Sequence, residues 1–266
     1  MRALIETILT PFYSKGGSSM SKKNFNKQQN TVARSGCKDM WNAFMLKGAT
    51  FTKHDIPICP TYLPNGLPKQ LVSYTTAKAI YKRELTAGND SFHISAFVHF
   101  CEDDQKFDGK RSSIWLFPDK AYEVLCHFDG IISPDFSTFA DFPDPLKRYN
   151  TYRMRAFGYW CYTKGLAVIN NVRWGTSETW DYTFDGIPQK SVIFIGTVAS
   201  DLRKLINKPD FENGLYKMVE ILRPHTIIVY GSSNYPFFSK IKEQGITVIS
   251  FPSDTDLAYR KGDNHE

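Results

Sequence analysis

The chain repeats one pattern, in which a run of apolar residues ends in a short polar cluster and a helix-like stretch follows. The pattern is clearest at residues 130–137, 166–175, 191–200 and 225–233. Near-continuous apolar runs are typical of strands buried on both faces of a parallel sheet, and their alternation with helices indicates an α/β fold. Ligands of such folds bind where strands end and loops begin. The polar clusters are therefore the first place to look for a site.

Strands and helices can be assigned along the chain from these runs. Candidate strands lie at 93–100, 130–135, 166–174, 191–197, 225–231 and 245–251, and candidate helices at 73–85, 117–128, 144–165, 211–224 and 237–244. About six mostly parallel strands are fewer than the eight that close a TIM barrel. We therefore expect an incomplete or irregular TIM-like barrel, with an open doubly wound sheet as the alternative.

Composition divides the chain into four parts. Residues 1–35 carry a net charge of +5 out of +6 for the whole chain and are rich in Ser, Lys, Asn and Gln, which predicts a flexible basic tail. We expect an irregular and helical segment packed on the core at 36–90, an α/β core domain at 91–252 and a frayed C-terminus at 253–266. Met20 is a second candidate translation start, so whether residues 1–19 belong to the protein stays open.

The overall composition excludes several classes of protein. Hydrophobic residues make up 42% of the chain and aromatic residues 15%, which is enough for a packed core and excludes global disorder. No run of 18 apolar residues is present, so we expect no membrane-spanning helix and no membrane partner. The five cysteines are widely spaced without a C-x-x-C pair, which fits a reducing, cytoplasmic location. The oligomeric state is not indicated.

Four residues are candidates for catalysis. Asp135 follows an apolar run, where a carboxylate can act as a general base or bind a metal. Asn171 and Arg173 lie two residues apart in a candidate strand and therefore point the same way. Arg153 falls near the apolar stripe of the 144–165 helix, where a cation is unusual. The alternative is structural, with Asp135 as a turn residue and Arg173 in a buried ion pair.

Further residues at the strand ends are candidates for substrate binding. Glycine turns let backbone N–H groups approach an anion, and polar or aromatic side chains beside them can orient a ligand. The candidates are Ser137, Asn170, Trp174, Thr197, Tyr230 and Ser232. No nucleotide-binding, zinc-protease or nucleophile-elbow motif occurs in the chain. The sequence therefore locates a site without naming a reaction.

Two adjacent acids are candidate metal ligands. Asp103 and Asp104 follow the 93–100 strand and, with Asp135, supply the oxygen ligands that Mg²⁺ prefers. Mg²⁺ is thus a candidate cofactor, and a solvated acidic turn is the alternative interpretation.

Several strings resemble a known family. ISPDFSTF (132–139), YNTYRMRAFGYW (149–160) and VINNVRWG (168–175) are the most specific, and PICP, DDQKFDG, FDGIP, IGTV and IIVYG extend the similarity over residues 36–252. The chain resembles the bacterial and phage proteins grouped as domain of unknown function 4417, which are carried by low-GC Gram-positive bacteria, their phages and mobile elements. The resemblance implies a shared fold and site, and the family supplies no activity.

Different classes of function fit these observations. The first is an enzyme acting on an anionic, phosphate-containing or nucleotide-like small molecule bound by the arginines and amides. The second is a non-enzymatic phage or plasmid accessory protein that binds nucleic acid through its basic tail, or a host protein. In a third interpretation, the inward polar residues form only a satisfied buried network.

Overall fold

The computed structural model describes residues 38–257, except 199, 201, 203, 205, 206 and 255. The chain divides into two compact units, Met1–Lys47 and Gly48–Glu266. The described part of the first unit contains the short 3-10 helix η1 (Ala43–Leu46). The predictions for the basic tail at 1–35 and for most of 253–266 fall outside the described residues.

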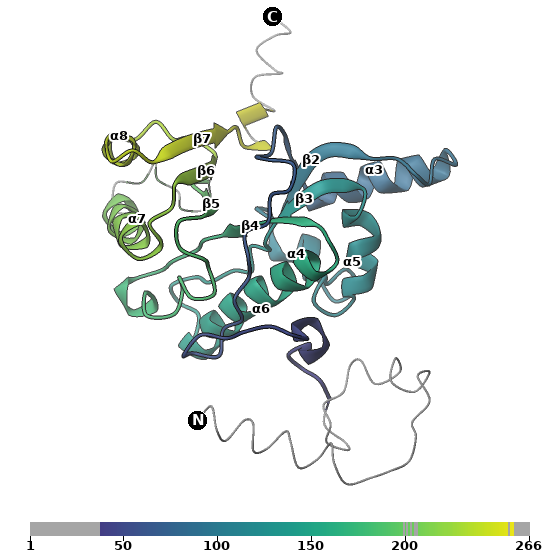
Figure 1. The fold of residues 1–266 in the computed structure, drawn as a ribbon, viewed down its shortest axis with the longest axis horizontal. Coiled ribbons are helices and arrows are strands. Elements are labelled where there is room, and N and C mark those ends of the chain that lie inside the picture. The colour runs from purple at the N-terminus through teal and green to yellow at the C-terminus, as the bar shows by residue number, and fades with distance from the viewer. Residues whose placement is uncertain are drawn as a thin grey trace, which may run out of the picture. The chain divides into compact units, whose positions relative to one another are not determined.

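Seven parallel strands form the sheet of the second unit, and their order in space is their order in the sequence (Figure 1). They are β1 (Leu71–Ser73), β2 (Ile94–His99), β3 (Phe128–Ile132), β4 (Ala167–Asn171), β5 (Val192–Gly196), β6 (Thr226–Tyr230) and β7 (Thr247–Phe251). The sheet curls into a half barrel, and no pairing between β1 and β7 closes it within the described residues. The predicted α/β class with parallel strands is confirmed.

Helices connect the strands. They are α3 (Tyr74–Thr86), α4 (Asp104–Phe107), α5 (Pro118–Leu125), α6 (Asp144–Thr163), α7 (Lys208–Leu222) and α8 (Pro236–Glu243). Proline stands in the first turn of each of the last four, where its missing N–H leaves no helical bond unmade. Gly165 adopts φ 88° two residues after α6 and ends it. The β4–β5 connection carries only the 3-10 helix η2 (Ser177–Thr179).

The strand β1 was not predicted from the sequence. Its three residues are too few to show a period, and Ser73 both ends the strand and caps α3 by accepting a hydrogen bond from the Thr76 N–H. The sequence predicts α3 from its capping residue and its helical pattern. The strand β1, in contrast, is defined only by its pairing with β2, from Leu71↔Phe97 to Ser73↔His99.

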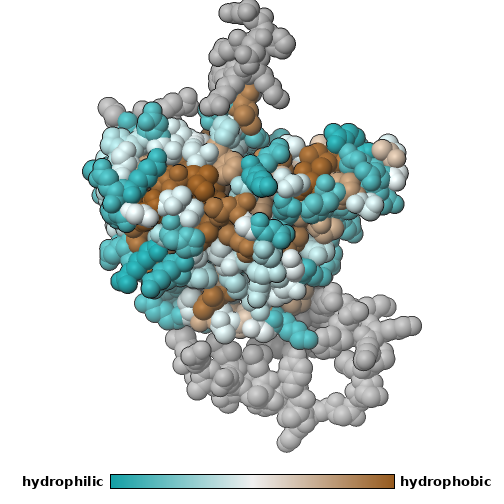
Figure 2. All heavy atoms as spheres, turned by 45° about the horizontal axis from the view of Figure 1, so that its top comes forward, coloured by the Kyte–Doolittle hydropathy of each residue, from teal (hydrophilic) through white to brown (hydrophobic). Residues whose placement is uncertain are grey.

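The two faces of the sheet bury different apolar clusters. On the outer face of β5 and β6, residues such as Ile193 and Ile227 pack against α7 and α8. On the inner face, a second cluster joins Phe97, Ile132, Ala167, Ile169, Val192, Phe194, Ile228 and Tyr230. Apolar surface also gathers in the middle of the face in Figure 2, with hydrophilic residues around it. The second cluster thus covers the inner face of the sheet from β2 to β6.

A segment before β1 passes between β4 and β5. Tyr62 pairs with Val168 of β4 through both backbone bonds, at 2.9 and 2.8 Å. Thr61 Oγ1 donates to Val192 O of β5 at 3.2 Å. The two strands pair directly only from Asn170↔Ile193 onward. The segment, dark blue in Figure 1, therefore occupies the gap between the first halves of these strands.

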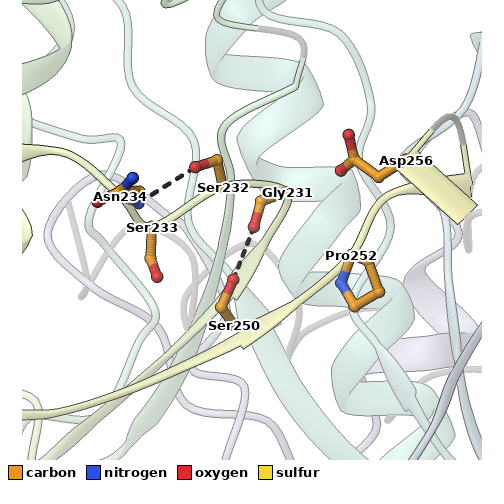
Figure 3. Close-up of a pocket in the computed structure, with 7 residues that line it drawn as sticks. All are labelled: Gly231, Ser232, Ser233, Asn234, Ser250, Pro252 and Asp256. Carbon is orange, nitrogen blue, oxygen red and sulfur yellow. Dashed lines mark hydrogen bonds between the residues drawn. The ribbon is translucent and has the colours of Figure 1, made fainter. Parts of the chain in front are cut away.

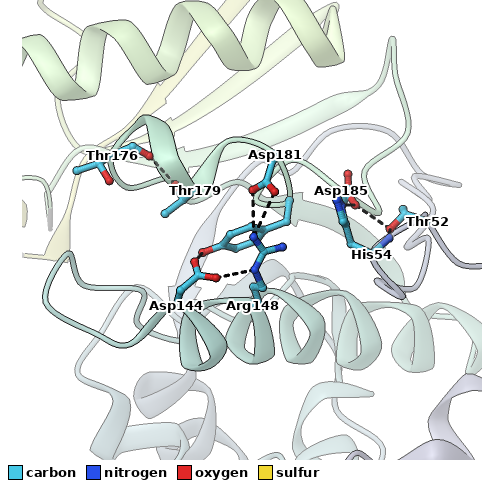
Figure 4. Close-up of polar contacts among 9 residues, drawn as sticks. Thr52, His54, Asp144, Arg148, Thr176, Thr179, Asp181 and Asp185 are labelled. Atoms are coloured by element: carbon cyan, nitrogen blue, oxygen red, sulfur yellow. Dashed lines mark hydrogen bonds and ion pairs between the residues drawn. The ribbon is translucent and has the colours of Figure 1, made fainter.

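Polar contacts fasten the long β4–β5 connection to the rest of the unit (Figure 4). Arg148 of α6 bonds Asp144 at 2.6 Å and Asp181 at 3.2 Å. His54 Nδ1 and Thr52 Oγ1 both contact Asp185 Oδ2, at 2.8 and 2.7 Å. The connection is thereby held near its middle, at Asp181 and Asp185, without an α-helix. None of the helices in the described part of the chain is long and apolar enough to cross a bilayer.

Candidate functional site

A carboxylate, an amide and a guanidinium meet just past the ends of β3 and β4. Asn171 Nδ2 donates to Asp135 Oδ1 at 2.7 Å, and Arg173 Nη1 donates to Asp135 Oδ2 at 3.0 Å. Asp135 and Asn171 are 9% and 1% exposed, whereas the Arg173 side chain is 21% exposed. We call these three residues the Asp135 cluster. The Asp135 carboxylate is thereby held in one orientation, whereas the Arg173 guanidinium still reaches solvent.

The cluster is anchored to the sheet by backbone contacts. Ser133 Oγ accepts a hydrogen bond from the Asn171 N–H at 2.8 Å, and Arg155 Nη1 donates to Asn171 O at 2.9 Å. Arg155 is fully buried, and its other guanidinium bonds go to the carbonyls of Asp185 and Thr183. Burial lowers the pKa of Arg155 to about 10, which still keeps it charged at neutral pH. Asn171 is therefore fixed from both its N–H and its carbonyl.

The Asn171 side chain leaves one atom without a protein partner. Its Nδ2 group is used by Asp135, and its buried Oδ1 has no hydrogen bond within the described residues. Buried polar atoms in folded proteins are nearly always hydrogen-bonded to protein or water. The Asp135 cluster thus presents one acceptor that a ligand or an ordered water can satisfy.

His99 ends β2 and is fully buried. Its Nδ1 accepts a hydrogen bond from the Cys101 N–H at 3.2 Å. A backbone N–H can only donate, so the neutral ring carries its proton on Nε2. That nitrogen has no partner in the described part of the chain. Burial lowers the pKa of His99 to about 4, against the opposing charges of Asp254 and Asp135, so the ring is neutral at pH 7.

Two neighbours of His99 complete the inner end of the site. The Tyr230 ring lies 4.4 Å from the His99 ring, centroid to centroid, and its hydroxyl accepts a bond from the Asp254 N–H at 2.9 Å. Burial raises the pKa of the Cys101 thiol well above its usual range, and the nearby Asp135 charge raises it further. Cys101 is therefore a neutral thiol, unsuited to act as a thiolate nucleophile at neutral pH.

Arg153 belongs to a second, separate polar group. It donates to Asp108 Oδ2 at 2.6 Å and to Asn150 Oδ1 at 2.7 Å, and its guanidinium lies 3.9 Å from the Phe136 ring centroid. Asn150 Nδ2 donates in turn to Ser137 O. Of the four candidate catalytic residues, the structure gathers Asp135, Asn171 and Arg173 and places Arg153 in this Arg153 network.

The candidate metal ligands are not assembled as a cage. Ser137 donates to Asp104 from its N–H at 3.2 Å and from its hydroxyl at 2.9 Å, while Asp103 is exposed beside α4. Burial raises the pKa of Asp104. No group of three or more His, Cys, Asp or Glu residues in the described part of the chain could hold a metal ion. Asp103, Asp104 and Asp135 therefore do not form such a group in the described part of the chain.

The other candidate binding residues either make structural contacts, as Asn170 and Trp174 do, or lie at the ends of β5 and β6. Asn170 points away from Asn171, and its Nδ2 donates to Cys59 O at 2.8 Å, so it holds the segment between β4 and β5. Trp174 packs against Phe211 of α7 at a centroid distance of 5.0 Å. Thr197, Tyr230 and Ser232 lie at the ends of β5 and β6, where Thr197 Oγ1 donates to Ser232 O at 3.1 Å.

A hollow of about 640 Å³ opens at the ends of β6 and β7 (Figure 3). Its polar lining consists of Ser232, Ser233, Asn234, Ser250 and Asp256. It begins directly after Tyr230, which packs on His99. The hollow and the Asp135 cluster therefore share the carboxyl-end side of the sheet.

Sequence reasoning missed His99, Cys101 and Asp108 as parts of these groups. His99 has a signal in the sequence, because it lies two residues after Phe97 and so shares the inner face of β2. Asp108 follows a short helix with no strand pattern nearby. Its pairing with Arg153, 45 residues away, is a matter of tertiary contact alone.

The parallel half-barrel sheet places this chain among the α/β proteins. The family model described as Domain of unknown function (DUF4417) matches residues 56–252, and the chain belongs to that family. The Gene 1 protein of Mycobacterium phage L5 is 28% identical over 134 residues, which are 50% of this chain and 56% of the relative. The Gene 1 protein of Mycobacterium phage D29 is 28% identical over 138 residues, or 52% and 49%.

The chain spans about half the length of the curated relatives it matches. No solved structure matches it. The predicted family and its association with phages are thereby confirmed.

Proposed function

We propose that the chain is an enzyme whose Asp135 cluster binds an anionic, phosphate-containing or nucleotide-like small molecule. The observation that carries the proposal is the unpartnered Asn171 Oδ1, buried beside a fixed carboxylate and a partly exposed guanidinium. A purely structural network would be expected to satisfy its own members. Here the third interpretation, a closed buried network, leaves one buried acceptor unexplained.

Each member of the cluster has a role that its contacts support. Arg173 binds Asp135 through Nη1, which leaves the donors on Nε and Nη2 for an oxyanion. Asn171 Oδ1 accepts a hydrogen bond from a hydroxyl or amino group of the ligand. Asp135, held by two donors, serves as the acid or base at the reacting atom.

The alternative, a non-enzymatic accessory protein, rests on residues 1–35, which lie outside the described part of the chain. The phage relatives are compatible with either class, since the name Gene 1 protein states no activity. The site geometry therefore favours the enzyme.

Thermal unfolding with three probes tests the proposal: inorganic phosphate, ribose 5-phosphate and adenosine 5′-monophosphate. A ligand at ten times its Kd stabilises the folded state by about 1.4 kcal/mol, which is roughly a 3 °C rise in Tm for a chain of this size. We expect such a rise with the wild type. Arg173→Met should lose it, and Arg111→Met, which removes an exposed arginine elsewhere, should keep it.

The Asp135→Asn variant tests the same site through an increase in affinity for the anion. It removes the negative charge that Arg173 now neutralises, so the anion should bind more tightly to this variant than to the wild type. Absence of a Tm rise with all three probes, or an unchanged rise in Arg173→Met, would contradict the proposal.

A further inference from the structure

His99 carries a second buried atom without a partner, and this atom is a donor. Its Nδ1 accepts a hydrogen bond from the Cys101 N–H at 3.2 Å, so Nε2 carries the proton of the neutral ring. The residue is 0% exposed, and Nε2 has no hydrogen bond within the described residues. Because Nδ1 is engaged, the neutral ring offers one further hydrogen bond, which it can only donate.

His99 and Asn171 face the same side of the sheet. Side chains two residues apart in a strand share a face. Phe97 of β2 belongs to the inner cluster, which places His99 on the inner face. Ile169 of β4 belongs to the same cluster and places Asn171 there as well. The unpartnered donor and the unpartnered acceptor therefore both lie on the inner side of the half barrel.

The strand register brings the two residues within reach of one small ligand. Val98 of β2 pairs with Ile131 of β3, which pairs with Val168 of β4, so Asn171 lies two residues beyond the position level with His99. At about 3.3 Å per residue and about 4.8 Å per strand, the Cα atoms of the two residues would lie about 12 Å apart in a flat sheet. The curl of the sheet shortens this distance on the inner side. A small phosphate ester can span the gap between the two side chains.

Charge places His99 close to the Asp135 cluster by a separate route. Burial lowers the pKa of His99 to about 4, and the charges of Asp254 and Asp135 oppose this shift. Burial raises the pKa of the Cys101 thiol, the Asp135 charge raises it further, and the Arg173 charge lowers it. The His99 ring and the thiol beside it therefore both lie within range of the Asp135 charge.

We propose that His99 donates a hydrogen bond from Nε2 to an uncharged acceptor atom of the ligand that Arg173 and Asn171 bind. This inference rests on the proposed function, since it extends the same ligand toward the end of β2. Inorganic phosphate held by Arg173 would leave the His99 donor unmatched, whereas a larger ligand can satisfy it. The substrate class is accordingly a phosphate ester that carries a sugar hydroxyl or a base nitrogen.

NMR of the ring nitrogens in the isotope-labelled full chain tests this contact in the wild type. It reports the tautomer and the hydrogen bonding of each of the six histidines. We expect His99 to carry its proton on Nε2, and ribose 5-phosphate or adenosine 5′-monophosphate to shift that nitrogen and its proton. Inorganic phosphate should leave both signals in place. A shift with ribose 5-phosphate identifies a sugar hydroxyl as the acceptor, and a shift with the nucleotide alone identifies a base nitrogen.

Two substitutions separate the donor from the ring. His99→Phe keeps an aromatic ring against Tyr230, whose centroid lies 4.4 Å away, and removes the donor. It should weaken the binding of the ester about tenfold, the effect of losing one good hydrogen bond to a ligand, and leave the Kd of inorganic phosphate unchanged. His99→Gln supplies an amide N–H near the position of Nε2 and should recover most of the loss.

His127→Phe is the matched control. His127 Nδ1 contacts Phe92 O at 2.9 Å, and the residue directly precedes β3, at the amino end of the sheet. This variant should bind all three probes as the wild type does.

The outcomes separate this inference from the proposed function. If a bound ester leaves the His99 ring signals unmoved, the donor serves an ordered water only and the contact is refuted. Equal weakening of ester and phosphate binding in His99→Phe would also refute it, because such a loss reports a disturbed structure. In both cases the anion site at Arg173 stands. If an ester shifts the His99 signals but Arg173→Met binds it as tightly as the wild type, the contact stands and the anion site falls. If none of the three probes binds, both fall.

Discussion

Gly214 offers a test in which two physical effects predict opposite signs. It lies inside α7, where alanine is favoured over glycine by about 0.8–1.0 kcal/mol. A Cβ at this position would lie 2.2 Å from Trp174 Cδ1 and 2.3 Å from Nε1. The indole ring is packed against Phe211, at 5.0 Å between centroids, and Phe184, at 6.5 Å.

Overpacking of this kind costs about 1–3 kcal/mol. With about 2 kcal/mol as the central value, Gly214→Ala should destabilise the protein by about 1 kcal/mol after the gain in helix propensity. Urea unfolding followed by circular dichroism measures the change. An unchanged m-value would show that the compactness of the two states is unaffected.

The Trp174→Ala background reverses the expected sign. With the indole removed, only helix propensity remains, and Gly214→Ala should stabilise by about 1 kcal/mol. If Gly214→Ala already stabilises the wild-type protein, the packing of Trp174 on α7 is wrong. In that case Trp174 would not be held against α7.

Two further predictions concern buried charge. The pKa of His99 is about 4 in the folded protein and near 6.5 in the unfolded chain, so the stability that its neutral form contributes is complete above pH 6.5 and is lost as the pH falls toward 4, roughly 3 kcal/mol in all. The His99→Gln variant should lose less free energy of unfolding over this pH range than the wild type does. Plots of unfolding free energy against pH that run parallel for the two proteins would contradict the prediction. Arg155→Lys should lower the free energy of unfolding by about 2–3 kcal/mol, because one ammonium cannot reach the three carbonyls of Asn171, Thr183 and Asp185. The control Arg148→Lys, at an exposed ion pair, should lower it by under about 1 kcal/mol. Equal losses of stability in the two variants would refute the anchoring role of Arg155.

Periodicity predicted the sheet because the strands are local patterns. The apolar runs of β2 to β7 alternate with helical stretches, which predicts parallel strands. Their order in the sheet comes from the strand pairing, which follows the order in the sequence. Successive side chains of a strand point to opposite faces of the sheet. Accordingly, the Asn171 side chain bonds Asp135, whereas the Asn170 side chain bonds Cys59 O. Strand ends are less well defined, since β4 stops at Asn171 and Trp174 lies beyond it.

Tertiary contacts decided what the patterns could not. Arg153 was expected on a buried face, which is correct, but its partner Asp108 comes from a segment without a periodic pattern. The contacts of Asp135 with Asn171 and Arg173 could be expected, because neighbouring parallel strands end at the same edge of the sheet. The role of His99 could not, because a lone histidine in an apolar strand gives no sign of which nitrogen is bonded.

The passage of residues 59–63 between β4 and β5 joins an early part of the chain to strands that are synthesised much later. A half barrel built only from consecutive units could add one strand at a time as the chain leaves the ribosome. Here the middle of the sheet can close only around a piece synthesised long before, since Cys59 and Asn170 are 111 positions apart. Loop closure over that length slows folding, and a deletion at 59–63 would leave a slot through the centre of the fold.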